Sequence, residues 1–424
     1  MNTTLPCYCP AAAENESIKD FSFTLLDTIN AVPELQWNKH IPEANRLMQY
    51  EELKLIQTTQ QDKMQFRYVF VKKQDITVGV IYFQLVRFTG NDLLNYFPEE
   101  PKETFKKYAY KTVRGLSEPL IKTVDLKLLV SGNVFMTGEN GFYFSQEIGL
   151  AQRAMLLRKA VREAIKTDSQ IRAVLIGDLY EPKSEFDSSF KKCGYSEITV
   201  EADMGLKLNS EWKTFADYIG AMSSKYRVRA KKVFSLCKES GIARRDLNAE
   251  EIAQYEEQLF DLYNMVISRA EFKLAALTKD FFRLQKQLMG DQYRVYAYFK
   301  GEEMVGFISL FLLGKKMEVH YTGMNKDVTR SINLYQHMLY DMIEFGIDNR
   351  AEKLHFGRTA PEIKSTVGAA PSPMYGYVKH FNPAFNYLMV RNFTANLKPK
   401  QYVMRDPFKT TGPQTPEGGL KDIQ

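Results

Sequence analysis

Residues 66–83 read FRYVFVKKQDITVGVIYF, and residues 293–309 read YRVYAYFKGEEMVGFIS. In both stretches aromatic and β-branched residues surround a short polar turn, which is the pattern of an antiparallel β-hairpin. The Val-Gly dipeptide that begins at Val78 stands 227 residues before the one that begins at Val305. The match predicts that one strand–turn–strand unit is used twice in this chain.

Two further matches follow these hairpins in the same order. Phe135–Asn140 resembles His320–Asn325 at an offset of 185 residues, and Leu175–Gly177 resembles His355–Gly357 after a helical stretch. The offset falls from 227 to 185, so about 42 extra residues belong to the first copy, near residues 89–130. Solenoid repeats have periods of ~20–50 residues. A repeat this long therefore predicts two homologous α/β halves.

The repeat and the composition of the ends predict the domain organisation. We expect a flexible arm at 1–19, an N-terminal half at 20–209, a C-terminal half at 210–405 and a disordered tail at 406–424. The tail is rich in proline and glycine and has few apolar side chains, which is typical of disorder.

Composition and charge limit the class of protein. The chain has 424 residues, of which 44% are apolar and 25% charged, as in ordinary globular proteins. Its net charge of +6 is compatible with anionic small ligands or a membrane surface. The longest apolar stretch, Met304–Leu313, is about half the ~20 residues of a membrane span. We expect a cytoplasmic protein without a transmembrane segment or secretory signal, with peripheral contact to the inner face of the membrane as an option.

A small-residue turn opens an amphipathic helix in the first half. The turn reads Gln146-x-x-Gly149-x-Ala151, it is expected to follow a strand at Asn133–Thr137, and the helix is expected over 152–165. A helix start exposes unpaired backbone N–H groups and the positive end of the helix dipole, which favour an anion. The small side chains would let a pyrophosphate approach the backbone.

The order of elements in this region resembles that of the GNAT acyltransferase superfamily. The elements are the turn, the helix, the apolar strand at 171–176 and Phe190–Tyr195. There, the turn binds the pyrophosphate of acyl-coenzyme A, and a splay between the flanking strands receives the pantetheine arm. The resemblance implies acyl-coenzyme A as co-substrate and no tightly bound cofactor. We expect no metal site, because Cys7 and Cys9 have no second Cys/His pair at zinc spacing. Many members carry a Tyr acid at the position of Phe190, so Tyr180 becomes the candidate acid for the leaving thiolate.

The corresponding segment of the second half keeps the pattern without its small residues. Arg330-x-x-Asn333-x-Tyr335 replaces the turn, and a helix is expected over Leu334–Phe345. Arg330 and Asn333 are therefore candidates for binding the donor. The large Tyr335 is expected to crowd a phosphate bound as in the first half.

Two segments of the second half resemble tandem GNAT proteins, namely the Fem-type peptidoglycan aminoacyltransferases and related bacterial N-acyltransferases. In these a glycine-rich strand end precedes Lys-x-x-x-Gly, which Lys364 and Gly368 match, and a basic helix like Ser223–Lys232 lies between the halves. The resemblance implies that four residues bind substrate: Tyr321, Gly357, Arg358 and Lys364.

The basic segment itself predicts an anion site. Lys225, Arg229 and Lys232 fall on one helical stripe because their spacings are four and three. The compensating anion is a coenzyme phosphate, a lipid phosphate or a tRNA backbone; the alternative is a solvated basic face with salt bridges. Lys225 and Arg229 are our candidates for contacting the donor.

Acyl transfer to an amine requires that the amine lose a proton, which a His or a carboxylate accepts. His320 and His355 lie on predicted strands that should be neighbours around the splay, and strand alternation puts Glu318, His320 and Thr322 on one face. The candidate bases are therefore His320, His355 and Glu318. The alternative is that His320 and His355 are ordinary strand histidines with satisfied hydrogen bonds.

We expect an α/β fold of two GNAT-like halves, each a mixed, mostly antiparallel sheet flanked by helices. The expected function is acyl transfer from acyl-coenzyme A, or another thioester carrier, to a primary amine. One alternative is a Fem-type transferase dependent on aminoacyl-tRNA, the case in which a nucleic acid is a partner. The other is a binding protein without catalysis, supported by Phe190 and Tyr335. The sequence leaves the acceptor amine, the acyl length and the catalytic half open.

Overall fold

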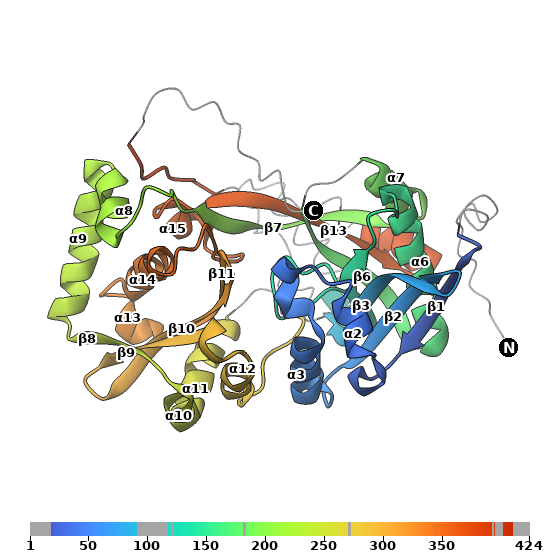
Figure 1. Cartoon of the computed structure of the whole chain (residues 1–424), viewed down its shortest axis with the longest axis horizontal. Coiled ribbons are helices and arrows are strands. Elements are labelled where there is room, and N and C mark those ends of the chain that lie inside the picture. Colours follow the sequence, from blue (N-terminus) through green and yellow to red (C-terminus); the bar gives the residue numbers. More distant parts are fainter. Residues whose placement is uncertain are drawn as a thin grey trace. The chain divides into compact units, whose positions relative to one another are not determined.

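The computed structural model describes residues 18–90, 118–119, 122–180, 184–269, 273–391, 394 and 402–409. The expected flexible arm lies outside the described residues up to residue 17, the expected insert over 91–117 and the expected tail from residue 410 on. The chain forms two compact units (Figure 1). Unit 1 comprises Met1–Val200, Ala270–Leu277 and Met374–Pro399, and unit 2 comprises Glu201–Arg269, Thr278–Pro373 and Lys400–Gln424.

Unit 1 contains a mixed sheet with helices on both faces. Its strands follow the order β1 (Phe21–Leu26), β2 (Gln65–Lys73), β3 (Ile76–Thr89), β4 (Asp125–Ser131), β6 (Ile171–Tyr180) and β13 (Ala370–His380, in this unit from Met374 on), and β5 (Phe142–Phe144) pairs with β3. Only the pair β4–β6 is parallel among the described strands of this unit. The helical segments are η1 (Ile29–Ala31), α2 (Glu34–Asn38), η2 (Glu43–Met48), α3 (Tyr50–Gln60), α6 (Leu150–Thr167), α7 (Ser184–Lys192), α16 (Pro383–Phe385) and η4 (Asn386–Val390).

The strand alternation of β2 explains how the helices cover this sheet. Val69 and Val71 face the core that contains the apolar stripe of α6. The alternate residues Tyr68 and Phe70 contact the buried ring of Trp37 in α2, at centroid distances of 5.7 and 5.8 Å. Both expected elements, the hairpin and the helix after the turn, are confirmed.

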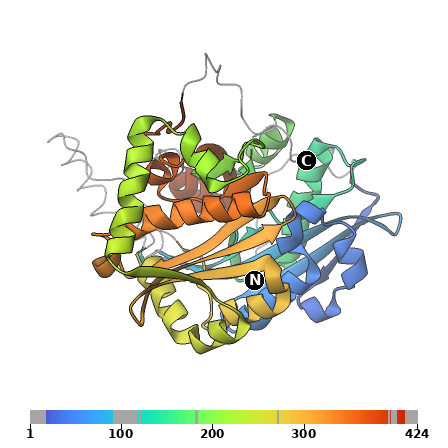
Figure 2. The same ribbon diagram turned by 60° about the vertical axis from the view of Figure 1, so that its left-hand side comes forward.

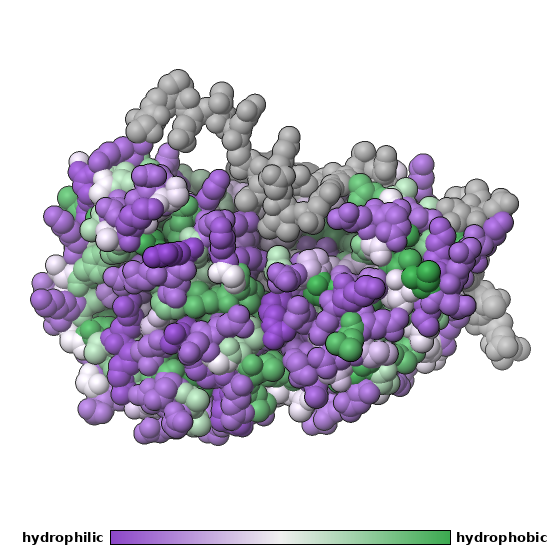
Figure 3. Space-filling view, in the orientation of Figure 1, coloured by the Kyte–Doolittle hydropathy of each residue, from purple (hydrophilic) through white to green (hydrophobic). Residues whose placement is uncertain are grey.

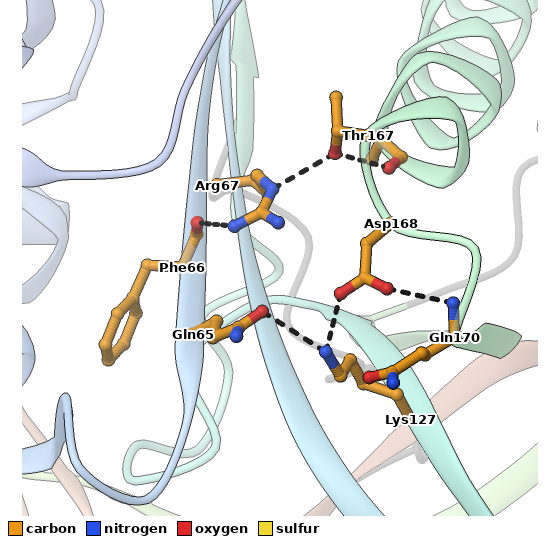
Figure 4. A network of polar contacts seen from close by, with 8 residues as sticks. Gln65, Phe66, Arg67, Lys127, Thr167, Asp168 and Gln170 are labelled. Atoms are coloured by element: carbon orange, nitrogen blue, oxygen red, sulfur yellow. Dashed lines mark hydrogen bonds and ion pairs between the residues drawn. The ribbon is translucent and has the colours of Figure 1, made fainter.

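A polar network joins the end of α6 to the strands beneath it (Figure 4). The guanidinium of Arg67 on β2 donates to Thr167 Oγ1 at 3.3 Å. Lys127 Nζ on β4 lies 2.6 Å from Asp168 Oδ2, and Asp168 Oδ1 accepts from the N–H of Gln170 at 2.9 Å. The two cations therefore lie beside the C-terminus of α6, where the helix dipole favours positive charge.

Replacing Asp168 by Asn should lower the free energy of unfolding by about 1–2 kcal/mol at pH 7, because a charge-assisted bond is lost. Burial opposes ionisation, but the bonds from Lys127 and Gln170 outweigh it and lower the pKa of Asp168. The native carboxyl thus ionises at lower pH than the unfolded one, whose pKa is about 3.9. The stabilisation is present above that value and lost as the pH falls through the native pKa. Urea unfolding of the wild type and of Asp168→Asn at pH 7 and pH 3 measures the difference in free energy of unfolding. An equal difference at both pH values would mean that the ionised Asp168 carboxylate does not provide this stabilisation.

The expected strand at Asn133–Thr137 is wrong. These residues belong to a loop, 132–141, that connects β4 to β5. Met136 N–H donates to Asn133 O at 3.1 Å, which makes a tight turn inside the expected strand, and Gly132 and Gly138 on either side have φ angles of 120° and 88°. The loop closes on β3, because Tyr82 N–H donates to Gly141 O at 2.7 Å.

The strands of unit 2 are also paired in a mixed arrangement. Its strands follow the order β7 (Ser196–Lys207, in this unit from Glu201 on), β12 (Lys353–His355), β11 (Lys316–Met324), β10 (Glu303–Leu313), β9 (Tyr293–Lys300) and β8 (Ile242–Asp246), and of these pairs only β11–β12 is parallel. The helices are α8 (Phe215–Ala221), α9 (Ser224–Glu239), α10 (Ala249–Gln254), α11 (Glu256–Ile267), α12 (Phe281–Met289), η3 (Gly290–Gln292), α13 (Lys326–Thr329), α14 (Leu334–Asp348) and α15 (Pro361–Ser365).

The sheet of unit 2 is also covered on both faces, as Figure 2 shows for the orange helix α14 and the yellow helices α11 and α12. α8, α9 and α14 enclose one hydrophobic core with the sheet. On the other face Tyr263 of α11 contacts Tyr321, and Phe282 of α12 contacts Phe307, each at a centroid distance of 5.1 Å. The expected second hairpin, basic helix and helix after the turn are confirmed.

The α/β class and the mixed, mostly antiparallel sheets with flanking helices are confirmed. The expected boundary at residue 209 stays a prediction. In the compact units, the end of β7 from Glu201 on belongs to unit 2, and β13 from Met374 on belongs to unit 1. Each unit thus includes a strand segment from the opposite half of the sequence.

The surface of the described residues is mainly hydrophilic on the face in Figure 3, with scattered apolar side chains. Scattered exposed apolar residues, such as Leu35 and Ile76, are normal on a protein surface. None of the helices in the described ranges has the length and apolar character that crossing a bilayer requires.

Candidate functional site

The sheet of unit 2 splays between two parallel strands. β11 and β12 pair over three residues only, ending with Glu318 opposite His355. β11 continues to Met324 in contact with β10, whereas the chain turns away after His355 through Gly357, whose φ is 71°. Among the described strands, none pairs with this edge of β11 beyond Glu318. The splay therefore begins at Glu318 and His355.

A β-bulge lies on β11 inside the splay. The register with β10 passes from Val319 opposite Leu310 to Thr322 opposite Ile308, so His320 and Tyr321 together face Ser309. The hydroxyl of Ser309 accepts from Tyr321 N–H at 3.1 Å and donates to Tyr321 O at 3.3 Å. The expectation that Thr322 shares a face with Glu318 and His320 is wrong, because the extra residue reverses the alternation.

His320 lies among aromatic rings. Its imidazole is 5.0 Å from the ring of Phe311, 5.6 Å from Phe281 and 4.2 Å from Tyr321, measured between centroids. Glu318, two residues earlier, forms an ion pair with Lys316. Roles of His320, Tyr321 and Glu318 in the reaction stay predictions.

His355 is bonded to a carboxylate that the sequence reasoning missed. Its Nδ1 lies 2.7 Å from Oδ2 of Asp203 on β7, and the two residues are 4% and 1% exposed. His355 Nε2 is buried without a hydrogen-bond partner among the described residues. A signal existed: Met204 and Leu206 face the core, so strand alternation turns Asp203 to the opposite face.

Lys364, expected to bind substrate, anchors the loop that follows β12. Its Nζ donates to the carbonyl oxygens of Phe356, Gly357 and Arg358 at 2.8, 3.0 and 2.6 Å. Burial lowers the pKa of Lys364 to about 7, against the opposing effect of Asp203 and a second carboxylate on β7. These bonds fix the backbone beside His355; substrate contacts of Gly357, Arg358 and Lys364 stay predictions.

A basic pocket of about 710 Å³ lies at the N-terminus of α14. Its charged lining residues are five cations and one acid: Arg229, Lys232, Arg269, Lys326, Arg330 and Asp327. None of the five cations forms an ion pair with another described residue. Met324, the last residue of β11, also lines the pocket, so the pocket adjoins the far end of the splay.

The pocket unites several of the expected donor-binding residues. Arg229 comes from α9, whereas Arg330 and Asn333 come from the turn before α14. Lys225 does not line the pocket; it lies one turn earlier on α9, 5.9 Å from the ring of Tyr226. Sequence reasoning missed Arg269 and Lys326, since they are single cations in separate segments. Tyr335, expected to crowd a phosphate, lines the pocket and packs partly against the core.

In the corresponding turn of unit 1, the side chain of Arg153 bonds backbone carbonyl groups. Gly149 is the N-cap of α6, and the guanidinium of Arg153 donates to Ile148 O at 2.7 Å and to Ser145 O at 3.3 Å. Gln146, Gly149 and Ala151 therefore lie in a turn whose carbonyl groups are already bonded. Their role in donor binding stays a prediction.

The end of β6 in unit 1 is occupied by loop 132–141. Gly138 N–H donates to Asp178 Oδ2 at 2.8 Å, and the hydroxyl of Tyr180 lies within clashing distance of where a Cβ at residue 138 would be. Phe190 is fully buried and stacks on Tyr377 at 4.7 Å. Tyr180 is 40% exposed, and its role as an acid stays a prediction.

No group of three or more metal-ligating side chains suited to an ion occurs in the part of the chain that the structure describes.

Comparison with known proteins gives one family match. The FemAB_like family, described as peptidoglycan biosynthesis/recognition, matches residues 156–413. A search of curated proteins finds no match. The family match covers more than half of the chain.

Two solved structures are similar over most of the chain. FemX is 11% identical, with a TM-score of 0.50, over 86% of this chain and 99% of FemX. A tandem GNAT protein from the clavulanic acid biosynthesis pathway is 10% identical, with a TM-score of 0.51, over 86% of this chain and 99% of that protein. At these identities the likeness concerns the fold, and it includes the tandem arrangement.

Proposed function

We propose that this chain, which belongs to the FemAB-like family, is an acyltransferase with two GNAT-like units. Its unit 2 transfers an acyl group from a phosphate-bearing thioester to a primary amine. The donor's phosphates bind in the basic pocket, and its acyl end reaches into the splay between β11 and β12. Acyl-coenzyme A is the simplest such donor.

The observation that carries this proposal is the charge of the pocket. Five cations and one acid line the pocket, and the cations form no ion pairs with other described residues, so they repel one another until an anion binds. The N-terminus of α14 adds backbone N–H groups and the positive end of its dipole. A donor that carries several phosphate charges meets these requirements, and Met324 connects the pocket to the splay.

Unit 1 is the weaker candidate for the donor. Loop 132–141 packs against β6 where a carrier arm would enter. A carrier arm that enters unit 1 would have to displace this loop. We therefore assign donor binding to unit 2.

Isothermal titration of the full chain with coenzyme A, acetyl-coenzyme A and a long-chain acyl-coenzyme A tests the donor. We expect binding with at least one of them, weakened by added salt because the contacts are ionic. Mass spectrometry after incubation with the bound thioester and a panel of primary amines then tests transfer. No heat with any of the three at high protein concentration would overturn acyl-coenzyme A as donor.

A second donor class, aminoacyl-tRNA, is favoured by the exposed face of α9. Beyond the pocket residues, this helix exposes Lys225, Lys231 and Lys238, which form no ion pairs with other described residues. A free coenzyme would contact the pocket only. A nucleic-acid backbone carries a phosphate at every nucleotide, so it could also contact the lysines of α9 outside the pocket.

The two donor classes differ in salt dependence. Exchanging both Lys231 and Lys238 for Gln should leave the affinity for acyl-coenzyme A unchanged, because neither residue lines the pocket. For an aminoacyl-tRNA the same change should reduce the slope of log affinity against log salt concentration by the amount that up to about two lost phosphate contacts produce. Fluorescence anisotropy at several salt concentrations separates the cases. Binding of either donor without any product would support the non-catalytic alternative.

A further inference from the structure

We propose that Asp203 is a positioning residue, which holds His355 so that Nε2 of its imidazole accepts the proton of the attacking amine. This inference rests on the proposed function and selects one base from the three candidates. His355 touches the reacting amine, whereas Asp203 acts through His355.

The bond between the two residues sets the tautomer of the ring. An ionised carboxylate only accepts hydrogen bonds, so at 2.7 Å from Asp203 Oδ2 the Nδ1 of His355 is the donor. In the neutral ring Nε2 then carries the lone pair. Carboxylate and ring are both buried, so solvent competes little for this bond.

His355 Nε2 lacks a hydrogen-bond partner among the described residues, although it is fully buried. A buried polar atom without a partner costs about 1–3 kcal/mol, so a ligand group that bonds it is favoured. The N–H group of a bound amine would supply the missing partner.

The position of His355 fits the base role better than those of the other candidates. It is the last residue of β12 and lies opposite Glu318, where the splay begins. Glu318 is engaged by Lys316, and His320 lies among aromatic rings on the bulge. His355 thus combines an oriented lone pair with a place beside the arm of the donor.

The charged groups around the pair come from three elements. β11 supplies Lys316 and Glu318, β12 supplies Lys353, and α15 supplies Lys364. Lys364 Nζ is bonded to three carbonyl oxygens, so it attracts the Asp203 carboxylate without replacing His355 as its partner.

The proton and electrons balance in the proposed step. The lone pair of the neutral amine forms a bond to the thioester carbonyl carbon, and Nε2 takes one proton from the amine nitrogen. The carbon–sulfur bond breaks with its electron pair on sulfur. The proton on the imidazolium then passes to the thiolate or to water, which returns His355 to its neutral form.

The test compares Asp203→Asn, Asp203→Glu and His355→Gln with the full-length wild type. A general base contributes about 10²–10⁴-fold, so we expect kcat to fall by about 10²-fold or more in His355→Gln and in Asp203→Asn. The KM for the thioester should stay unchanged, since its phosphates bind elsewhere, and Asp203→Glu should recover part of the rate. Asp246→Asn on β8 is the matched control, because it removes a carboxylate at the other end of the same sheet.

A second readout does not need substrate. NMR of protein labelled with ¹⁵N-histidine, with the signals assigned through His355→Gln, should show the Nδ1–H tautomer in the wild type and its loss in Asp203→Asn. Wild-type kcat in Asp203→Asn, or the Nε2–H tautomer in the wild type, would overturn the inference. Failure of the proposed function looks different, because the wild type then transfers no acyl group while the NMR signals still decide the orientation.

Discussion

Exchanging both Arg229 and Arg330 for Gln is expected to raise the dissociation constant for the donor about 10³-fold. A hydrogen bond to a charged group contributes about 1.5–3 kcal/mol, so each guanidinium accounts for roughly 10- to 100-fold. Both residues line the basic pocket, one from α9 and one from the turn before α14, and neither has an ion pair with another described residue. Isothermal titration with the thioester that binds the wild type measures the change.

A charge-matched variant controls for net charge. Lys39→Gln combined with Lys63→Gln removes two exposed cations from unit 1 and should leave the affinity unchanged. A third variant, Gly149→Leu, obstructs the turn of unit 1, where a Cβ has no atom within 4 Å and would be tolerated. If Gly149→Leu abolished binding while the double Arg variant retained it, the donor would belong to unit 1 and our assignment would be wrong.

Local sequence patterns were sufficient for the regular elements. The hairpins could be predicted because alternating aromatic and β-branched residues enclose polar turns, and α6 because its apolar residues recur at helical spacing. The failures lie where one residue changes the geometry. The bulge at His320 and Tyr321 reverses the alternation, and it depends on the side chain of Ser309 from another strand.

The candidate site could be predicted only where neighbours in sequence are also neighbours in space. Arg330 and Asn333 belong to one turn, so their pairing with the helix start followed from the motif. Arg269 and Asp203 come from segments distant in sequence, and their contribution depends on tertiary packing. The Lys-x-x-x-Gly spacing located Lys364 correctly beside the strand end, but the sequence could not show that its amine bonds three backbone carbonyls.

Gly323 repeats Gly138 in the sequence, yet the two glycines are needed for different reasons. Gly138 has a left-handed φ of 88°, whereas Gly323 lies in strand β11, where α11 approaches closely. A Cβ at residue 323 would collide with the ring of Phe307 and lie 2.8 Å from the backbone carbon of Leu262. Because a backbone atom cannot move aside without shifting α11, the substitution strains the packing of α11 on β11.

Gly323→Ala should therefore lower the free energy of unfolding by about 3 kcal/mol, at the upper end for overpacked sites, and lower the melting temperature by about 6–12 °C. Differential scanning calorimetry measures both. Gly220→Ala is the matched control in the same unit: its Cβ meets no atom within 4 Å and it lies in α8, so we expect no loss and a gain of up to about 1 kcal/mol. In a protein that already carries Phe307→Ala, Gly323→Ala should lower the free energy of unfolding by less than it does in the wild type, because one of the two clashes is removed. Equal melting temperatures for Gly323→Ala and Gly220→Ala would mean that α11 does not pack on β11 as closely as described.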